Sequence, residues 1–462
     1  MYFLAFRMNV PITVSTKWKA EIDPELKQKL ISNEVKFRKH PGIRDVKCVA
    51  MPVRLQNAFA NMWKKYSPKD VLNKSKELIQ HLGSRKMPVE QAEIDVKANE
   101  FNSYLNDERG DINSLAPAER EIEAKKRKDL VADMLRHNIY NWNHIEYDAY
   151  KSMLYLLGRL AVNYAVLYRV FSEITKEVPD YKVKTLLDFG SGLGTTMWAV
   201  NELWEKSLGE CYNVDISNEM NELAQLLLQG GNEGKKMMLK KVYFRQYLPA
   251  TNVVKFNLVV SAFSLLELPS IQTRLKTIHS LWLKTEDFLV LVEDGNMAGY
   301  EAIMEARDFI LHLQEKSTDP EDIGHVFAPC QHDLSCPRLS DGTSTPCNFE
   351  VNYNPVRLRN TITMANHRFS YVIFRKGQRG TTDKKWPRIV RPVVLRGKHV
   401  ICRTCTHDGR LTEITSTKTK HGTEVYRCAR ASKWGDLLPF DKLELKSQEE
   451  IALEQNAENE AS

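Results

Sequence analysis

A chain of 462 residues is longer than a single hydrophobic core serves, so two or three domains are expected. With 42% hydrophobic and 27% charged residues, and no uninterrupted apolar stretch of about 18 residues, the composition indicates a globular protein and excludes a membrane-spanning helix. The formal net charge of +7 is modest for this length, but it is unevenly distributed along the chain.

The N-terminal part of the chain is predicted to be helical. Residues 1–20 carry three cations and no acid, which fits a mitochondrial targeting segment, although an ordinary irregular N-terminus explains this bias equally well. Within residues 21–180 the clearest helix runs from Tyr147 to about Glu173, because its apolar side chains recur at three- and four-residue steps. The polar stretch Glu90–Lys128 is either an exposed helical arm or a flexible insert.

Residues 181–320 alternate short apolar runs with helical segments. This alternation is typical of a parallel sheet covered by helices, and it predicts an α/β, Rossmann-like domain. The candidate strands are Thr185–Phe189, Glu210–Val214, Asn257–Ser261 and Phe288–Glu293.

A glycine-rich loop, Asp188-Phe189-Gly190-Ser191-Gly192-Leu193-Gly194, follows the first candidate strand. Its glycines allow close approach of the backbone to a ligand, and a helix from Thr195 would direct its N-terminus at that ligand. Glycine triplets alone are weak evidence, but Asp215 ends the next strand, where an acid can accept both ribose hydroxyls. The predicted cofactor-binding residues are Asp188, Gly190, Gly192, Gly194 and Asp215.

Asp188 favours S-adenosylmethionine over a dinucleotide. A carboxylate at the head of the loop would repel a pyrophosphate, whereas it suits a cationic sulfonium and its ammonium group. The turn where a methyl acceptor would be oriented, Ser261–Pro269, has neither an Asn/Asp-Pro-Pro-aromatic motif nor a cysteine nucleophile. Glu267 is a base in principle, but a solvated carboxylate explains it better, and Ser264 is expected to cap a helix. No catalytic residue is therefore predicted.

After about Asp319, prolines, glycines and cysteines become frequent between strand-like runs such as Arg368–Arg375 and Glu424–Arg427. We predict a β-rich module over residues 321–440 and a disordered acidic tail over residues 441–462. Between Arg375 and Arg403, ten cations accompany the single acid Asp383. Such a run either attracts a polyanion such as RNA or forms a solvated surface loop.

Cysteines in this module indicate a metal centre. Three of them adjoin prolines in turn-rich sequence, where thiolates can converge on one centre, and the Cys402/Cys405 pair can supply a fourth ligand. Because only one short C-x2-C knuckle is present, a [4Fe–4S] cluster is favoured, with zinc as the alternative. The predicted ligands are Cys330, Cys336, Cys347 and Cys402, with Cys405 as the alternative fourth ligand and His325, His332 or His407 as possible substitutes for a thiolate. The other cysteines, Cys48, Cys211 and Cys428, are expected to be buried and free.

Several stretches together resemble the methyltransferase-like assembly factors of the mitochondrial small ribosomal subunit. They are the glycine loop followed by Trp198, the turn Leu265–Pro269, the cysteine run that begins with Phe327-Ala328-Pro329, and Tyr426–Arg430 with Trp434-Gly435-Asp436. The resemblance implies a matrix protein that binds the immature small subunit and its rRNA between head and body. It also implies a Rossmann-like S-adenosylmethionine-dependent methyltransferase fold that retains cofactor binding without transfer, and a [4Fe–4S] cluster on Cys330, Cys336, Cys347 and one of Cys402 and Cys405, of which we favour Cys402.

One departure from the family pattern is Asn296, which stands where such proteins tend to carry a threonine in a Glu-x-Gly-Thr turn.

The sequence as a whole leaves three hypotheses about function. The first is a non-catalytic, rRNA-binding assembly factor, and the second is an active rRNA methyltransferase of the small subunit. The third, a radical enzyme, is disfavoured because the cysteines lie far in sequence from the glycine loop.

Overall fold

The computed structural model describes residues 18–445 apart from 65–68, 141, 252, 318, 320–321, 357–362 and 381–382. The expected targeting segment lies outside the described residues up to position 17, and the expected acidic tail lies outside them from position 446. In the part of the chain that is described, no helix has both the length and the apolar character needed to cross a membrane.

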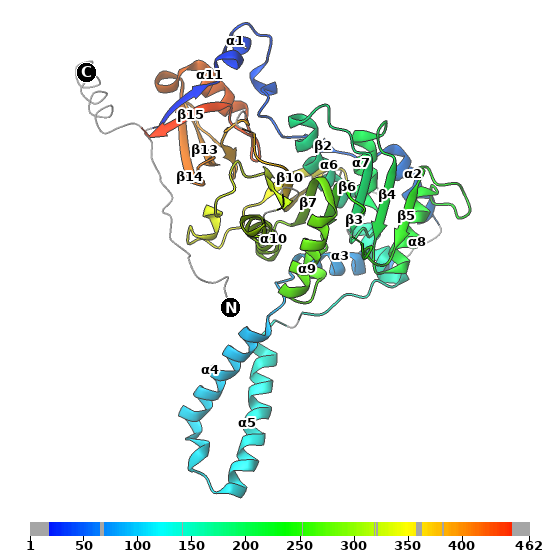
Figure 1. Ribbon diagram of the computed structural model, residues 1–462, viewed down its shortest axis with the longest axis vertical. Helices are drawn as coiled ribbons and strands as arrows, with labels where there is room; N and C mark the ends of the chain where they lie inside the picture. Colours follow the sequence, from blue (N-terminus) through cyan, green and yellow to red (C-terminus); the bar gives the residue numbers. More distant parts are fainter. Residues whose placement is uncertain are drawn as a thin grey trace, which may run out of the picture.

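A mixed sheet forms the centre of the body, and nine strands of the described chain belong to it (Figure 1). Its parallel part follows the order β5, β4, β3, β6 and β7; β10 then pairs antiparallel with β7, β8 and β9 pair with β10, and β2 pairs with β9. The strands are β2 (Cys48–Val49), β3 (Thr185–Phe189), β4 (Glu210–Val214), β5 (Val242–Arg245), β6 (Phe256–Ala262), β7 (Thr285–Asp294), β8 (Gly324–Ala328), β9 (Phe349–Tyr353) and β10 (Ala365–Lys376). This order confirms the predicted Rossmann-like methyltransferase fold. The strand order reverses between β3 and β6, and open α/β sheets bind ligands outside the carboxyl ends of the strands at such a point, so we call this place the crevice.

Helices cover both faces of this sheet, which explains why β6 and β7 are nearly continuous apolar runs. One face packs against α2 (Val53–Trp63), α6 (Ala149–Glu177), α7 (Thr195–Trp204) and α8 (Asn218–Leu228). The other face packs against α9 (Ile271–Leu283) and α10 (Met297–Lys316). The predicted helix from Tyr147 is α6, which begins where the Asp148 side chain accepts a hydrogen bond from the Lys151 amide. A further helix, α3 (Lys69–Gly83), packs on α6.

The polar stretch that had two interpretations is a helical arm. Helices α4 (Gln91–Arg109) and α5 (Pro117–Asn138) form a hairpin that projects from the body (Figure 1). Arg127 fixes the hairpin from within, since its guanidinium donates to Asn106 Oδ1 at 2.6 Å and to the Gly110 carbonyl at 2.8 Å. Short 3-10 turns occur at Phe37–Lys39, Ile112–Ser114, Leu265–Glu267 and Pro337–Leu339.

A smaller module contains both the first and the last strand of the described chain. Its core lies between a four-stranded sheet, helix α11 and a two-stranded ribbon in which β1 pairs antiparallel with β15. The elements are β1 (Trp18–Ile22), α1 (Pro24–Ile31), β11 (Arg388–Ile389), β12 (Val394–Leu395), β13 (His399–Cys405), β14 (Leu411–Thr417), α11 (Lys418–Ala431) and β15 (Phe440–Leu445).

The module differs from the sequence expectations in three ways. Strands β8, β9 and β10 complete the main sheet, so the separate sheet begins at Arg388 and not near residue 321. Glu424–Arg427, expected as a strand, lies in α11, because Val425, Cys428 and Ala429 form a buried face at helical spacing. Residues 441–445, expected in the tail, belong to β15, where pairing with β1 satisfies their backbone groups.

One buried carboxylate connects these parts. Glu173 on α6 is only 1% exposed and binds Arg388 of the module at 3.0 and 3.1 Å, Arg169 at 2.9 Å and Arg44 at 3.2 Å. The Tyr371 hydroxyl on β10 donates to the same carboxylate at 3.0 Å. Burial raises the pKa of Glu173, but the three arginines outweigh burial and hold it well below the ordinary 4.5, so the carboxylate is ionised.

We expect Glu173→Gln to lower the free energy of unfolding by roughly 3–5 kcal/mol, because it leaves buried guanidinium groups without their counter-charge. Thermal unfolding at pH 7 measures the effect. Since the pKa of Glu173 is lowered in the fold, its contribution is present above pH 4.5 and is lost only as the pH falls well below that value. The exposed Glu233→Gln is the matched control, and equal midpoints for the two variants would contradict the role given to Glu173.

Candidate functional site

The glycine loop lies at the carboxyl end of β3, next to the point where the strand order reverses. Gly190, Gly192 and Gly194 have φ values of 68°, 47° and 67°, a left-handed conformation that side chains other than glycine rarely adopt. A Cβ atom on Gly190 would lie 2.4 Å from Ser264, whereas one on Gly192 would meet open space. Gly190 therefore serves packing, and Gly192 is the glycine that faces the ligand crevice. As expected, a helix, α7, begins at Thr195.

Two carboxylates flank this loop. Asp188 is the last residue but one of β3. It is only 1% exposed, and its Oδ2 has no hydrogen-bond partner among the described residues. Burial raises the pKa of Asp188 to about 8, although a hydrogen bond from Thr196 opposes the shift. Asp215 follows β4 and accepts from the Gly192 amide at 2.8 Å and the Ser217 amide at 2.9 Å. The structure thus brings the five predicted cofactor residues together, and their role in cofactor binding stays a prediction.

The acceptor side of the crevice is covered by the N-terminal region, which the sequence did not indicate. The Arg85 guanidinium pairs with Glu267 at 2.5 Å, the Tyr147 hydroxyl donates to the same carboxylate at 3.4 Å, and Trp142 donates to the Leu266 carbonyl at 3.0 Å. Glu267 is therefore held in a salt bridge and is not the solvated carboxylate that was expected. Ser264 makes no capping bond; it shares a 2.7 Å hydrogen bond with Ser261.

The end of β7 is also occupied by structural contacts. Asp294 binds both the Arg159 guanidinium and His367. Burial raises the pKa of Asp294, but the charge of Arg159 and the hydrogen bonds from His367 and Arg159 outweigh burial and hold it well below the ordinary range. Asn296, the departure from the family pattern, caps α10 by accepting from the Gly299 amide at 2.8 Å. It also donates to the Gly83 carbonyl at 2.9 Å. The side chain of Asn296 is thus used within the fold.

Four cysteines line one cavity where the main sheet meets the small module: Cys330, Cys336, Cys347 and Cys405. Burial and then the charges of the other three thiols raise the pKa of Cys405 well above its usual range, as expected for sulfurs that lie close together. Cys402, which we favoured as the fourth ligand, instead lies in the hydrophobic core of the module, and burial alone raises its pKa. Cys405 and not Cys402 lines the cavity because the two positions are three residues apart on β13, so their side chains point to opposite faces of the strand.

The surroundings of this cavity are polar and cationic. Arg307 is fully buried and donates to the carbonyls of His332 and Leu334 at 3.2 and 2.6 Å. Tyr300 contacts the Cys336 sulfur at 3.4 Å, and His332 contacts the Cys405 sulfur at 3.4 Å. Among the described side chains, no group of three or more His, Cys, Asp or Glu is arranged as a metal site.

The remaining cysteines and the basic run Arg375–Arg403 lie outside the cysteine cavity or only partly at it, and their surroundings differ from what the sequence predicts. Cys211 and Cys428 are buried, as expected, but Cys48 is exposed. The basic run does not form a continuous surface: Arg388 is buried against Glu173, Arg379 pairs with Asp333, and Arg403 pairs with Glu413. The sequence does not predict these pairs. Glu173 and Asp333 are far from their arginines along the chain, and Glu413 faces Arg403 only because β13 and β14 pair.

A model of the family described as mitochondrial small ribosomal subunit Rsm22 matches residues 149–439, which include the glycine loop and all four cysteines of the cavity. The chain belongs to the Rsm22 family. The human ribosome assembly protein METTL17, mitochondrial, is 38% identical over 402 residues, covering 87% of this chain and 85% of that protein. Ribosome assembly protein RSM22, mitochondrial, of Saccharomyces cerevisiae is 22% identical and covers 63% of this chain and 67% of its own length.

Among solved structures, magnesium protoporphyrin IX methyltransferase from Synechocystis PCC 6803 aligns with a TM-score of 0.30 and 11% identity, covering 54% of this chain and 99% of that chain. The family match agrees with the resemblance seen in the sequence. It extends from the start of α6 to the residue before β15, so the Rsm22 region contains both the glycine loop and the four cysteines of the cavity.

Proposed function

We propose that this chain is a mitochondrial assembly factor of the small ribosomal subunit that binds its rRNA between head and body in the matrix. The observation that carries the proposal is family membership, with a relative named as a mitochondrial ribosome assembly protein matching 87% of the chain. The sequence is basic overall, with a net charge of +7, as suits a partner of RNA.

We further propose that the crevice binds S-adenosylmethionine without transferring its methyl group. Asp188 would hold the ammonium group, Gly192 would let the backbone approach, and the exposed side chain of Ile216 next to Asp215 offers an apolar surface for the purine. When bound, the cofactor supplies an electrophilic methyl group. The chain's own contribution argues against transfer, since Arg85 and Tyr147 both bind Oε1 of Glu267, which is the only carboxylate of the acceptor turn Ser261–Pro269.

The protonation of Asp188 gives a test of cofactor binding. With a pKa of about 8, Asp188 is protonated at neutral pH in the free protein, and a bound cation favours its ionised form. The affinity for S-adenosylmethionine, measured by titration calorimetry, should therefore rise by up to about tenfold per pH unit from pH 6.5 to 8 and then level off. Asp188→Asn should bind more weakly and without this pH dependence, whereas the exposed Asp180→Asn should behave as wild type. Equal, pH-independent affinities would contradict the assignment.

We also propose that Cys330, Cys336, Cys347 and Cys405 hold a [4Fe–4S] cluster. The donor set supports it: the four thiols line one cavity and lie at turns or at a strand end, which can adjust around a cluster. A [4Fe–4S] core with four thiolates carries a net charge of about −2, and the buried Arg307 would offset part of it. Bound there, the cluster would tie the loops before β9 to strand β13 of the small module.

Single Cys→Ser variants of the full chain, purified without oxygen, test the ligand set. Wild type should contain about four iron and four acid-labile sulfide per chain. Cys405→Ser, Cys330→Ser, Cys336→Ser and Cys347→Ser should each lose most of both, while Cys402→Ser and Cys428→Ser, buried in the module core, should keep them.

Two outcomes would contradict this assignment. Stoichiometric zinc without sulfide would replace the cluster with the alternative metal. Loss of iron in Cys402→Ser with retention in Cys405→Ser would restore Cys402 as the ligand.

Genetic complementation separates the assembly role from the alternative, an active rRNA methyltransferase. Cells that lack the protein should accumulate a small-subunit precursor, and both Asp188→Ala and Gly192→Arg should restore assembly. The arginine side chain meets open space, although the left-handed backbone at this position costs it about 1–2 kcal/mol. Mass spectrometry of small-subunit rRNA is the second measurement. A modified nucleotide that disappears without the protein and returns only with an intact glycine loop would establish the enzyme instead.

A further inference from the structure

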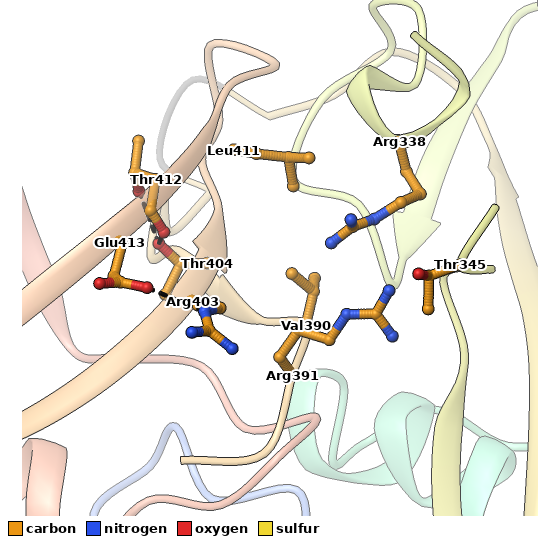
Figure 2. Close-up of a pocket in the computed structure, with 9 residues that line it drawn as sticks. All are labelled: Arg338, Thr345, Val390, Arg391, Arg403, Thr404, Leu411, Thr412 and Glu413. Carbon is orange, nitrogen blue, oxygen red and sulfur yellow. Dashed lines mark hydrogen bonds and ion pairs between the residues drawn. The ribbon is translucent and has the colours of Figure 1, made fainter. Parts of the chain in front are cut away.

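A pocket of about 290 Å³ opens on the small module beside the cysteine cavity (Figure 2). Arg338, Val390 and Leu411 line both spaces, so the pocket and the four thiols share a wall. The rest of the lining includes Thr345, Arg391 and Arg403. Its volume is at the lower end of small-ligand sites, which hold roughly 300–1,000 Å³.

The pocket contains more positive charge than the fold neutralises. Arg338 has a side chain that is only 9% exposed, and although Nη1 pairs with Asp341, its buried Nε has no hydrogen-bond partner among the described residues. Arg391 makes no hydrogen bond or ion pair to the described chain, and Figure 2 shows its guanidinium reaching into the same space as that of Arg338. Arg391 is partly buried and Arg338 is paired with Asp341, so the site as it stands holds one guanidinium without a counter-charge beside a second one, and an anion would be attracted to both.

Electrostatics and the neighbouring groups agree with this geometry. Burial and then the charge of Arg338 lower the pKa of Arg391, so the two guanidinium groups repel each other in the absence of an anion. Arg368, stacked over Trp434 with its guanidinium carbon 5.5 Å from the ring centre, adds positive charge nearby. Glu413 disfavours an anion in the pocket, because its carboxylate pairs with Arg403 at 2.8 Å and neutralises that positive charge. The net charge of the pocket is nevertheless positive.

We propose that this pocket binds the phosphate group of a nucleotide, either within a single-stranded RNA chain or as a free nucleoside phosphate. Guanidinium forks match phosphate oxygens in geometry, and paired arginines are typical of phosphate recognition. The Thr345 hydroxyl is a further donor at the rim, while Val390 and Leu411 offer apolar contact to a sugar or base. The RNA form of the proposal rests on the proposed function; the nucleotide form does not.

Fluorescence anisotropy with a labelled single-stranded RNA of twelve nucleotides tests the pocket in the full chain. Arg391→Gln should weaken binding about tenfold and reduce the slope of log affinity against log salt by about 0.7, as for one lost phosphate contact. Arg396→Gln, an exposed cation of the same module outside the pocket, should change affinity by less than about twofold. Because Arg391 has no partner in the described chain, its loss should leave the thermal midpoint unchanged.

Glu413→Gln supplies a test that misfolding cannot imitate. Removing the carboxylate frees Arg403 and should tighten RNA binding by about two- to threefold. Equal weakening by Arg391→Gln and Arg396→Gln, or no effect of Glu413→Gln together with none of Arg391→Gln, would overturn the RNA form and indicate a diffuse basic surface.

Calorimetric titration with adenosine monophosphate and with inorganic phosphate distinguishes the two sources. Nucleotide binding that requires Arg391, with RNA affinity independent of it, supports a free nucleoside phosphate as the occupant. If wild type binds neither RNA nor small-subunit precursors but still binds the nucleotide through Arg391, the proposed function fails and the pocket stands. Arg391-independent binding of every probe, or binding of none, overturns the pocket.

Discussion

The carboxylate of Glu173 is the interaction on which the relation between the two halves of this molecule depends. It lies near the C-terminal end of helix α6 of the methyltransferase-like body, yet its partners come from the N-terminal loop, from the same helix and from the small module. Such a buried network is costly to break, because any member left alone is an uncompensated charge. It therefore specifies where the module sits on the body.

That placement also shapes the cysteine cavity. Arg388 binds Glu173 and at the same time donates from Nε to the Pro329 carbonyl at 3.0 Å, directly before Cys330. The cavity draws three cysteines from the loops that follow β8 and one from the end of β13. A centre bound there would bridge two sheets that the Glu173 network already holds together, and the phosphate pocket on the other side of Val390 and Leu411 would share its rigidity.

The crevice and the arginine pocket differ in whether their charged groups have partners within the fold. In the crevice, the acceptor side is filled by the chain's own contacts, with Glu267 bound to Arg85 and Asp294 bound to Arg159. In the pocket where the module meets the loop between β8 and β9, Arg391 and the Nε atom of Arg338 lack partners among the described residues. Asp188 and these arginines are the groups to which we assign a cofactor and an anionic partner in our proposals.

The sequence by itself determined the local elements and the chemistry of each motif. The strands Thr185–Phe189 and Glu210–Val214, the left-handed glycines and the helix at Thr195 follow from periodicity and from backbone sterics within a few residues. Only the tertiary structure decided which groups meet: Cys405 and not Cys402 beside the other thiols, Arg388 inside the fold and not on an RNA-binding surface, and Arg85 over the acceptor turn. The physical reason is that a strand presents alternate residues to opposite faces, and which face is buried against which partner depends on contacts between segments hundreds of residues apart.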